Sequence, residues 1–401
     1  MITVLLNKAE FEYDIHSLVK AFYPKEDVYV STKDKEKKEE PVHYHMDVQF
    51  APEEIIFSWK KVEPSEENEN QTGITKRVAV DDTNRKETKN SLKRTLYQLL
   101  SEYTGVELPW GNLTGIRPTK IPMALLEEGK SEEEIARYMK ETYFTSDEKI
   151  KLSIEIAERE LELLHKLDYE EGYSLYIGIP FCPTTCLYCS FTSYSMSAWK
   201  NRMDDYLSAL EKELDYTAVK FAHKKLNSIY IGGGTPTTLN PQQLDRLIRK
   251  IKCSFDLSDL VEFTVEAGRP DSITKEKLMV LRNHDISRIS INPQTMKQET
   301  LDLIGRHHTV QQTIDSFYLA RELGFDNINM DLIVGLPGES LSDVADTMEV
   351  IRKLSPDNLT VHSLAIKRAA RLNIQRERYQ DFEIVNTADH IALTSKVAEE
   401  M

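Results

Sequence analysis

The sequence predicts an α/β fold in which parallel strands alternate with helices, preceded by a small α+β domain and a helical segment. Two observations carry this prediction. After residue 172, six short apolar runs are separated by segments of helical periodicity. Before residue 105, the apolar runs instead alternate with polar connectors and show the period of two that is typical of half-buried strands.

The six later strands are expected to be parallel neighbours, in an open sheet or a partial barrel. The carboxyl ends of such strands meet at one edge, where the functional residues of these folds lie. Pro180, residues 232–235, Glu266, Gln294 and Asp331 all fall at predicted strand ends. The expected strands are 173–180, 227–234, 261–268, 287–294, 327–337 and 357–366, and the expected helices include 201–222, 275–284, 297–305, 309–323 and 341–354.

Four segments are expected along the chain. They are a small α+β domain (1–105), a helical connecting segment (106–170), the parallel α/β domain (171–370) and a helical tail (371–401) that ends without a cap, as in a truncated chain. Within the first two, we expect strands at 28–32, 43–51 and 53–62, charged connectors at 33–40 and 63–73, helices at 90–105, 131–143 and 146–167, and a Gly/Pro inter-domain turn at 110–120.

Composition narrows the class of protein. The net charge of -15 argues against nonspecific nucleic-acid binding, which needs a basic surface. The sequence has no apolar run long enough to span a membrane and no basic segment before its first apolar residues, as a signal peptide would have. The four cysteines are too few and too clustered for a disulfide framework, which predicts a reducing, cytoplasmic location.

Three of the four cysteines, Cys182, Cys186 and Cys189, have the spacing C-x3-C-x2-C. Structural zinc sites take four ligands, and no second cysteine pair stands nearby. The remaining cysteine, Cys253, is expected to be a buried small residue at a helix end. A [4Fe-4S] cluster takes one thiolate per iron, so three thiolates leave one iron open to a small molecule. An iron–sulfur cluster is therefore favoured over zinc.

The stretch "YIGIPFCPTTCLYCSF" resembles the signature of the radical S-adenosylmethionine (SAM) superfamily, including the aromatic Tyr188 before the third cysteine. The resemblance implies a partial TIM-like barrel of six strands. It also implies that the open iron binds SAM, and that reductive cleavage yields a 5'-deoxyadenosyl radical. No catalytic residue is then expected beyond the cluster and the cofactor.

Further motifs, "GGGTPT", "VEAGRPDS", "SINPQT", "GRHHT" and "NMDLIVGLPGE", resemble those of the oxygen-independent coproporphyrinogen III oxidase (coproporphyrinogen dehydrogenase) family. "WGNLTGIRPTK" and "EAGRPD" are similar to its HemZ-like branch. The resemblance implies that Tyr176, Gly233 and Glu266 contact the cluster-bound SAM. Positions that line a second SAM site in the prototype are matched by Tyr188, Gly234, Thr235, Gln294, Arg306, Asp331 and Ala365.

The family reaction implied is oxidative decarboxylation of coproporphyrinogen III to protoporphyrinogen IX, with an electron donor and acceptor as further partners. The substrate is a tetracarboxylate, so Arg269, Arg288 and Arg306 are candidate carboxylate contacts. Adjacent His307 and His308 are expected to diverge, which disfavours a shared metal.

Phe191 stands where the prototype has a further cysteine. The same pattern occurs in the HemW-like branch, whose members bind haem, so a haem chaperone and a structural zinc protein stay open as alternatives.

Overall fold

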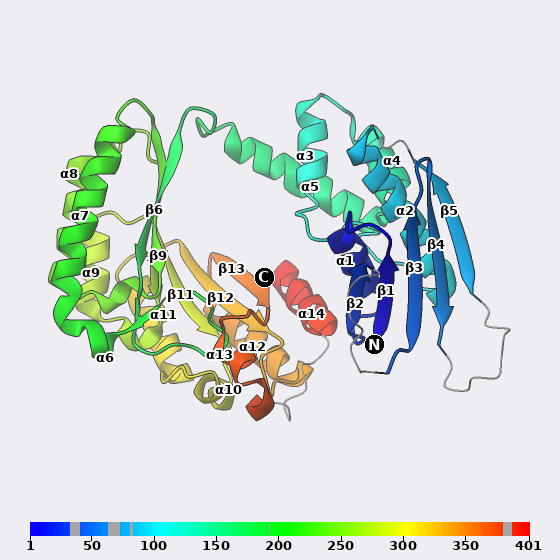
Figure 1. Cartoon of the computed structure of the whole chain (residues 1–401). Coiled ribbons are helices and arrows are strands. Elements are labelled where there is room, and N and C mark those ends of the chain that lie inside the picture. Colours follow the sequence, from blue (N-terminus) through cyan, green and yellow to red (C-terminus); the bar gives the residue numbers. More distant parts are fainter. Residues whose placement is uncertain (33–40, 63–72, 81–82, 192, 380–386) are drawn as a thin grey trace. The chain divides into compact units, whose positions relative to one another are not determined.

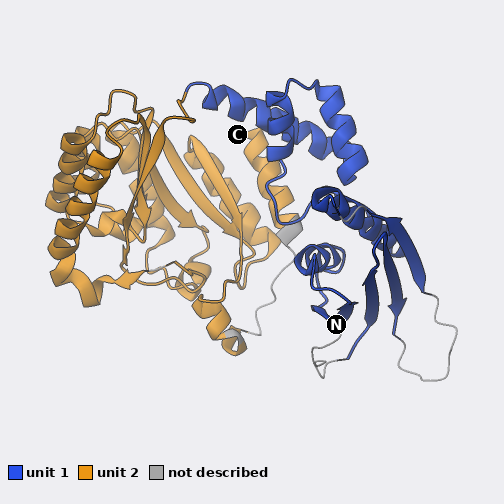
Figure 2. Ribbon diagram, turned by 45° about the horizontal axis from the view of Figure 1, so that its top comes forward, with its two compact units in different colours: residues 1–166 blue, residues 167–401 orange. Residues whose placement is uncertain are grey.

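The computed structural model describes residues 1–32, 41–62, 73–80, 83–191, 193–379 and 387–401. The chain divides into two compact units, Met1–Lys166 and Leu167–Met401, coloured separately in Figure 2. The predicted connector 33–40 and almost all of 63–73 lie outside the described residues. Over the described part of the chain, no helix combines the length and apolar character that crossing a membrane requires.

Unit 1 is built on a five-stranded sheet in the order β2-β1-β3-β4-β5 (Figure 1). The strands are β1 (Ile2–Leu6), β2 (Val28–Thr32), β3 (Tyr44–Phe50), β4 (Glu54–Lys61) and β5 (Ile74–Ala79). β1 is parallel to β2 and β3, whereas β3, β4 and β5 are antiparallel. Alternate residues of β1 are buried and share a core with α1 (Glu12–Phe22) and α2 (Arg85–Thr104).

The three strands predicted in this region are present, but the sequence patterns missed α1 and placed the start of α2 five residues late. Phe11, the N-cap of α1, has a left-handed backbone (φ 61°) and no side-chain capping bond. Because the usual Ser, Thr, Asp or Asn cap is absent, the sequence carries no start signal for this helix.

The rest of unit 1 is helical, as predicted, with α3 (Lys120–Glu127), α4 (Glu132–Tyr143) and α5 (Asp147–Leu164). Ser131 and Glu134 form the predicted capping box of α4. Gly111, in the turn before α3, has φ 57°, and a Cβ there would lie 1.9 Å from the Tyr143 carbonyl oxygen. Backbone is packed too tightly for any side chain at this position, which supports a packing role for the turn.

Unit 2 is built on six parallel strands in the order β13-β12-β11-β10-β9-β6, which confirms the predicted fold class. Among the described strands, β6 and β13 are the two unpaired edges, so the sheet does not close into a complete barrel. The strands are β6 (Tyr173–Ile179), β9 (Leu226–Gly233), β10 (Glu262–Gly268), β11 (Arg288–Gln294), β12 (Ile328–Val334) and β13 (Asn358–Ser363).

Helices cover one face of this sheet. They are α7 (Met203–Lys220), α8 (Pro241–Ser254), α9 (Lys275–Asn283), α10 (Gln298–Leu303), α11 (Val310–Glu322) and α12 (Leu341–Leu354), and Figure 1 shows α7, α8 and α9 stacked outside the strands. Short elements follow β6, namely β7 (Phe181–Cys182), β8 (Tyr194–Ser195), α6 (Met196–Trp199) and η1 (Lys200–Arg202). The last are α13 (Arg371–Ile374), η4 (Arg376–Tyr379) and α14 (Thr387–Glu400).

The two faces of each strand in this sheet differ in polarity. Ile229, Ile231, Val265 and Ile289 point into the helix-packed core. The alternate residues of the same strands are polar and face the other way, and they include Tyr230, Glu266 and Ser290. A polar inner face covered by no helix layer of its own is the interior of the partial barrel.

Candidate functional site

The three clustered cysteines lie on one loop directly after β6. Cys182 ends the short strand β7, Cys186 is buried, and Cys189 is half-buried. Burial raises the pKa of the Cys182 thiol, and the charges of Cys186 and Cys189 raise it further. The three thiols are therefore close enough for their charges to interact across the loop.

Hydrogen bonds to two separate segments hold this loop. The Thr184 hydroxyl donates to the Gly305 carbonyl at 2.7 Å, and Arg269 Nη1 donates to the Thr184 carbonyl (3.1 Å) and hydroxyl (2.7 Å). The Leu187 amide donates to the Ile304 carbonyl at 2.9 Å. The loop is thus fixed by the segments that follow β10 and β11, before any ligand is considered.

Arg269 was predicted as a substrate contact, and the structure contradicts that role. Its guanidinium is 3% exposed and pairs with both carboxylate oxygens of Asp271, at 3.0 and 2.7 Å. With its remaining Nη1 on Thr184, the side chain has no face left for a carboxylate ligand. Arg288 was also predicted in this role, but it is the first residue of β11 and lies at the opposite edge of the sheet.

A second buried arginine, Arg306, faces the thiols directly. Its Nη1 lies 3.8 Å from Cys186 Sγ and 3.5 Å from the Tyr188 hydroxyl, and its Nη2 donates to the Asn292 carbonyl. The side chain is 4% exposed, and its Nε has no partner among the described residues. A buried guanidinium beside the Cys186 thiol implies an anionic neighbour, since an uncompensated buried charge is costly.

Glycines at the end of β9 allow the loop to approach the sheet. A Cβ on Gly234 would lie 2.7 Å from the Phe181 carbonyl oxygen and 3.0 Å from Cys182 Sγ. Gly233 has φ 111°, and its Cβ would lie 2.9 Å from the Ile179 nitrogen. Thr235 follows, 1% exposed, with its hydroxyl 3.6 Å from Cys182 Sγ. Any side chain at Gly234 would occupy the space against the first thiol.

Two irregularities mark the carboxyl ends of the next strands. The pairing register shifts between Glu266 and Gly268 on β10 and between Ile291 and Gln294 on β11. Gln294, a buried non-glycine residue, has φ 69°. Such bulges and left-handed residues often redirect side chains next to functional sites.

Glu266 and two tyrosines form a polar group on the inner face. The Tyr230 hydroxyl donates to Glu266 Oε1 at 2.6 Å, and the ring of Tyr230 stacks on Tyr176 with centroids 5.8 Å apart. Burial and the charge of Asp331 raise the pKa of the Glu266 carboxyl. A cationic group or hydroxyl donors placed here would favour the charged carboxylate.

The remaining predicted residues lie on or just after the last two strands. Asp331 lies in the middle of β12 and accepts a hydrogen bond from Asn329, and Ala365 is exposed just after β13. The two adjacent histidines diverge as predicted: His307 is exposed, whereas His308 is fully buried with neither ring nitrogen paired among the described residues. Cys253, predicted to be buried, is exposed at the end of α8, because the last turn of this helix turns that position to solvent.

The residues present fit a cubane cluster better than a single ion. Among the described residues, no three His, Cys, Asp or Glu side chains converge as ligands of one metal ion. Each thiolate of a [4Fe-4S] cluster binds a different iron, so the three sulfurs need not meet at one point. The loop anchored at Thr184, the absent Cβ at Gly234 and the unsatisfied Arg306 Nε all fit such a group.

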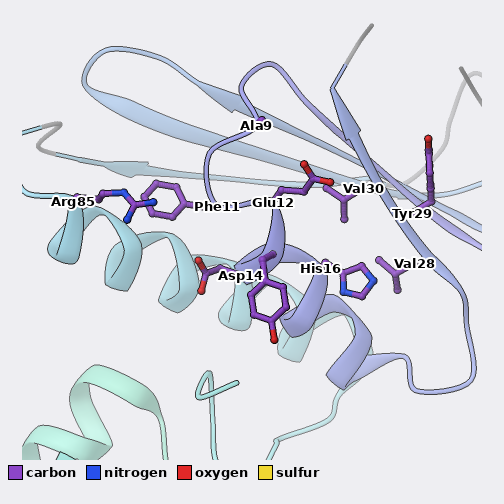
Figure 3. Close-up of a pocket in the computed structure, with 10 residues that line it drawn as sticks. Ala9, Phe11, Glu12, Asp14, His16, Val28, Tyr29, Val30 and Arg85 are labelled. Atoms are coloured by element: carbon purple, nitrogen blue, oxygen red, sulfur yellow. The ribbon is translucent and has the colours of Figure 1, made fainter. Parts of the chain in front are cut away.

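Unit 1 contains a hollow of about 600 Å³, which is shown in Figure 3. Two of its charged side chains are already paired, Arg85 with Glu10 and Asp14 with Lys89, and Arg85 lies 5.3 Å from the ring of Phe11. It contains no cysteine. The candidate site is therefore the cysteine loop of unit 2, and the molecule is of the class in which a parallel α/β barrel carries a cluster at its carboxyl edge.

Comparison with known proteins agrees with this class. Residues 176–351 match the model of the radical SAM superfamily. The chain is 44% identical over 299 residues to the oxygen-independent coproporphyrinogen-III oxidase-like protein HemZ of Bacillus subtilis, covering 74% of this chain and 60% of that protein. It is 40% identical over 198 residues to the heme chaperone HemW of the same species, covering 48% of this chain and 51% of HemW.

Among solved structures, the coproporphyrinogen III oxidase HemN of Escherichia coli, a radical SAM enzyme, is 29% identical and covers 59% of this chain and 55% of its own, with a TM-score of 0.47. The chain thus spans between about half and 60% of the length of these relatives. It carries a radical SAM domain of the HemN and HemZ family. The cofactors of this superfamily are a [4Fe-4S] cluster and SAM.

Proposed function

We propose that this protein converts coproporphyrinogen III to protoporphyrinogen IX without O2, as a step of haem biosynthesis. The observation that carries the proposal is the 44% identity to HemZ over 299 residues. That span is longer than the whole of unit 2, so the likeness includes part of unit 1. The HemW match covers only 48% of the chain.

Cys182, Cys186 and Cys189 would hold three irons of the cluster. Tyr176, Gly233 and Glu266 would contact the SAM bound to the fourth. The positions proposed for a second SAM are Tyr188, Gly234, Thr235, Gln294, Arg306, Asp331 and Ala365. Clustering of most of these residues at one edge of the sheet, described above, supports both assignments.

When bound, the cluster and SAM would supply the radical chemistry that removes one hydrogen atom from the β-carbon of a propionate. Loss of CO2 and of one electron to an acceptor would leave a vinyl group, once for each of two propionates. Within the chain, Glu266 orients the cofactor through its buried carboxylate, which Tyr230 holds at 2.6 Å. Arg306 offsets negative charge at Cys186, 3.8 Å from its Nη1.

The partners in this proposal are coproporphyrinogen III, an electron donor and an electron acceptor, with a cytoplasmic location inferred from the unpaired cysteines. Of the three arginines considered for the propionates, Arg269 and Arg288 are ruled out by their positions. The Nη1 and Nη2 atoms of Arg306 already contact Cys186 Sγ and the Asn292 carbonyl.

A haem-binding chaperone is the second candidate, and two observations favour it. The HemW relatives match at up to 40% identity. Phe191, which takes the place of a further cysteine, is 78% exposed beside the cysteine loop, and an exposed aromatic ring suits contact with a flat macrocycle.

The test is anaerobic reconstitution with iron and sulfide, followed by SAM, a chemical reductant and coproporphyrinogen III. Protoporphyrinogen and CO2 should form with the wild-type chain and not with Cys186→Ala. Tight haem binding by a fully reconstituted chain that yields no protoporphyrinogen would instead establish the chaperone.

A further inference from the structure

A strongly basic segment lies close behind the last strand of unit 2. Residues 366–379, called the basic segment here, contain Lys367, Arg368, Arg371, Arg376 and Arg378 against a single acidic residue, Glu377. The whole chain carries a net charge of -15. A cluster of cations on a protein of negative net charge creates a local positive potential that attracts an acidic partner or ligand.

The basic segment packs directly on the cysteine loop. The Leu372 amide donates to the Leu187 carbonyl at 2.9 Å, and Arg371 Nη2 donates to the Thr185 carbonyl. Leu187, Ile304, Leu336 and Leu372 form one small buried cluster beneath it. Thr185 and Leu187 flank the ligand position Cys186, so Arg371 contacts the residue next to a proposed cluster ligand.

The surface formed here has the anatomy of a protein interface. Lys367, Arg368 and Arg378 are exposed, and among them Ile374 is 70% exposed and Ile366 37% exposed. Next to them is a hollow of about 520 Å³ between Thr184, Gly305, His307 and Arg371. An apolar centre with a charged rim is typical of a docking surface, whereas a single carboxylate needs only a pair of donors.

This surface is distinct from the inner face of the barrel. The residues that line the hollow come from the cysteine loop, the connection after α10 and the segment around α13. None of Tyr230, Glu266, Asp331 or Asn329 lines it among the described residues. A partner bound here would therefore touch the outside of the loop while the inner face stayed available to substrate.

We infer that the basic segment and the outer surface of the cysteine loop form the docking site for a small acidic electron-carrier protein that reduces the cluster. The inference rests on the proposed cofactor site. Net charges of the same sign would make two acidic proteins repel each other, so a local cationic surface is needed to bring the carrier to this point of the chain.

Electron transfer between the two proteins needs no further reactant. The reduced carrier loses one electron and the cluster gains it, and no covalent bond forms or breaks in that step. The same electron is the one that reductive cleavage of SAM requires. A carrier docked on Thr184 and Thr185 reaches the cluster through the ligand loop, without a path across the barrel interior.

The test measures reduction of the reconstituted cluster, by anaerobic stopped-flow absorbance, with either a reduced plant-type ferredoxin or dithionite as the donor. Lys367→Glu/Arg368→Glu/Arg378→Glu should lower the second-order rate constant for ferredoxin about tenfold or more at low salt. The difference should shrink as ionic strength rises. The rate with dithionite should fall far less, because its reducing species is a small anion with a single charge.

A matched triple, Lys212→Glu/Lys220→Glu/Lys275→Glu, reverses three exposed charges on α7 and α9. It should change the ferredoxin rate less than twofold. An equal fall in both triples, or no fall in the first, would overturn the docking site, as would competition by free coproporphyrin III at this surface. Because cluster reduction needs no porphyrin turnover, a failed decarboxylase assay would leave this result standing; a chain that assembles no cluster would overturn both proposals.

Discussion

The two sheets of this protein are built on the same rule and differ at their edges. In each, alternate residues are buried against helices, and the other face carries polar side chains. In unit 1 the polar face satisfies itself: Thr3 Oγ1 lies 2.9 Å from His45 Nδ1, and His45 Nε2 lies 3.1 Å from Asp47.

The carboxyl edge of the sheet in unit 2 does not satisfy itself. Arg306 Nε, Asn292 Oδ1 and Ser193 Oγ are buried without a partner among the described residues. Bulges and a left-handed Gln294 interrupt the strands there, and glycines admit the cysteine loop. A polar sheet face alone therefore does not indicate a functional site. The site in unit 2 is indicated by the combination of an unsatisfied buried charge, close backbone approach and clustered thiols.

The largest expected effect comes from the thiols. Alanine at Cys182, Cys186 or Cys189 should abolish the visible iron–sulfur absorbance and reduce bound iron to background, since each thiolate holds one iron. Cys253→Ala is the matched control, because Cys253 is exposed on α8, and it should retain full iron content. Equal iron in all four variants would break the assignment.

Alanine at Gly234 should have a larger effect than alanine at Gly105, on both iron content and stability. Gly234→Ala should lower iron content several-fold and cost about 2 kcal/mol of stability, because its Cβ would meet the Phe181 carbonyl and Cys182 Sγ. Gly105→Ala in unit 1, where a Cβ meets nothing within 4 Å, should cost about 1 kcal/mol from its positive φ and leave iron content unchanged. Iron content and denaturant unfolding measure both.

Replacing the buried Arg269, which holds the cysteine loop through Thr184, should have a smaller effect on cluster binding. Arg269→Met should cost about 2–3 kcal/mol and speed iron loss to a chelator, since it removes buried contacts to Asp271 and Thr184. Arg85→Met in unit 1 breaks an ion pair whose arginine is 77% exposed, and it should cost under about 1 kcal/mol. If the two variants lose the same free energy of unfolding, burial does not strengthen the contacts of Arg269.

The smallest effect concerns pH. Burial lowers the pKa of His308 to about 4, below its usual 6.5, so the unfolded chain binds more protons between these values. Stability should therefore fall as pH drops from 7 to 5, by about 2 kcal/mol at most. His308→Leu should remove this slope, and His307→Leu, at the exposed neighbour, should keep it; urea unfolding at pH 7 and pH 5 tests the pair.

Much of this could be predicted from the sequence because periodicity and motif spacing are local. The six strands, the capping box at Ser131 and the thiol loop were all readable in this way. The clamp of Arg269 on Thr184 joins residues 85 positions apart, which no local pattern encodes. The same holds for the contact between the basic segment and the cysteine loop, and for the start of α1, which lacks a capping side chain.

The central claim is that three thiolates leave one iron of the cluster open to SAM. Its most direct test is the electron paramagnetic resonance spectrum of the reduced, reconstituted protein before and after SAM is added. We expect four irons per chain and a spectrum that shifts on SAM addition, with the shift weakened in Glu266→Gln. A fully loaded cluster whose spectrum does not respond to SAM would contradict it.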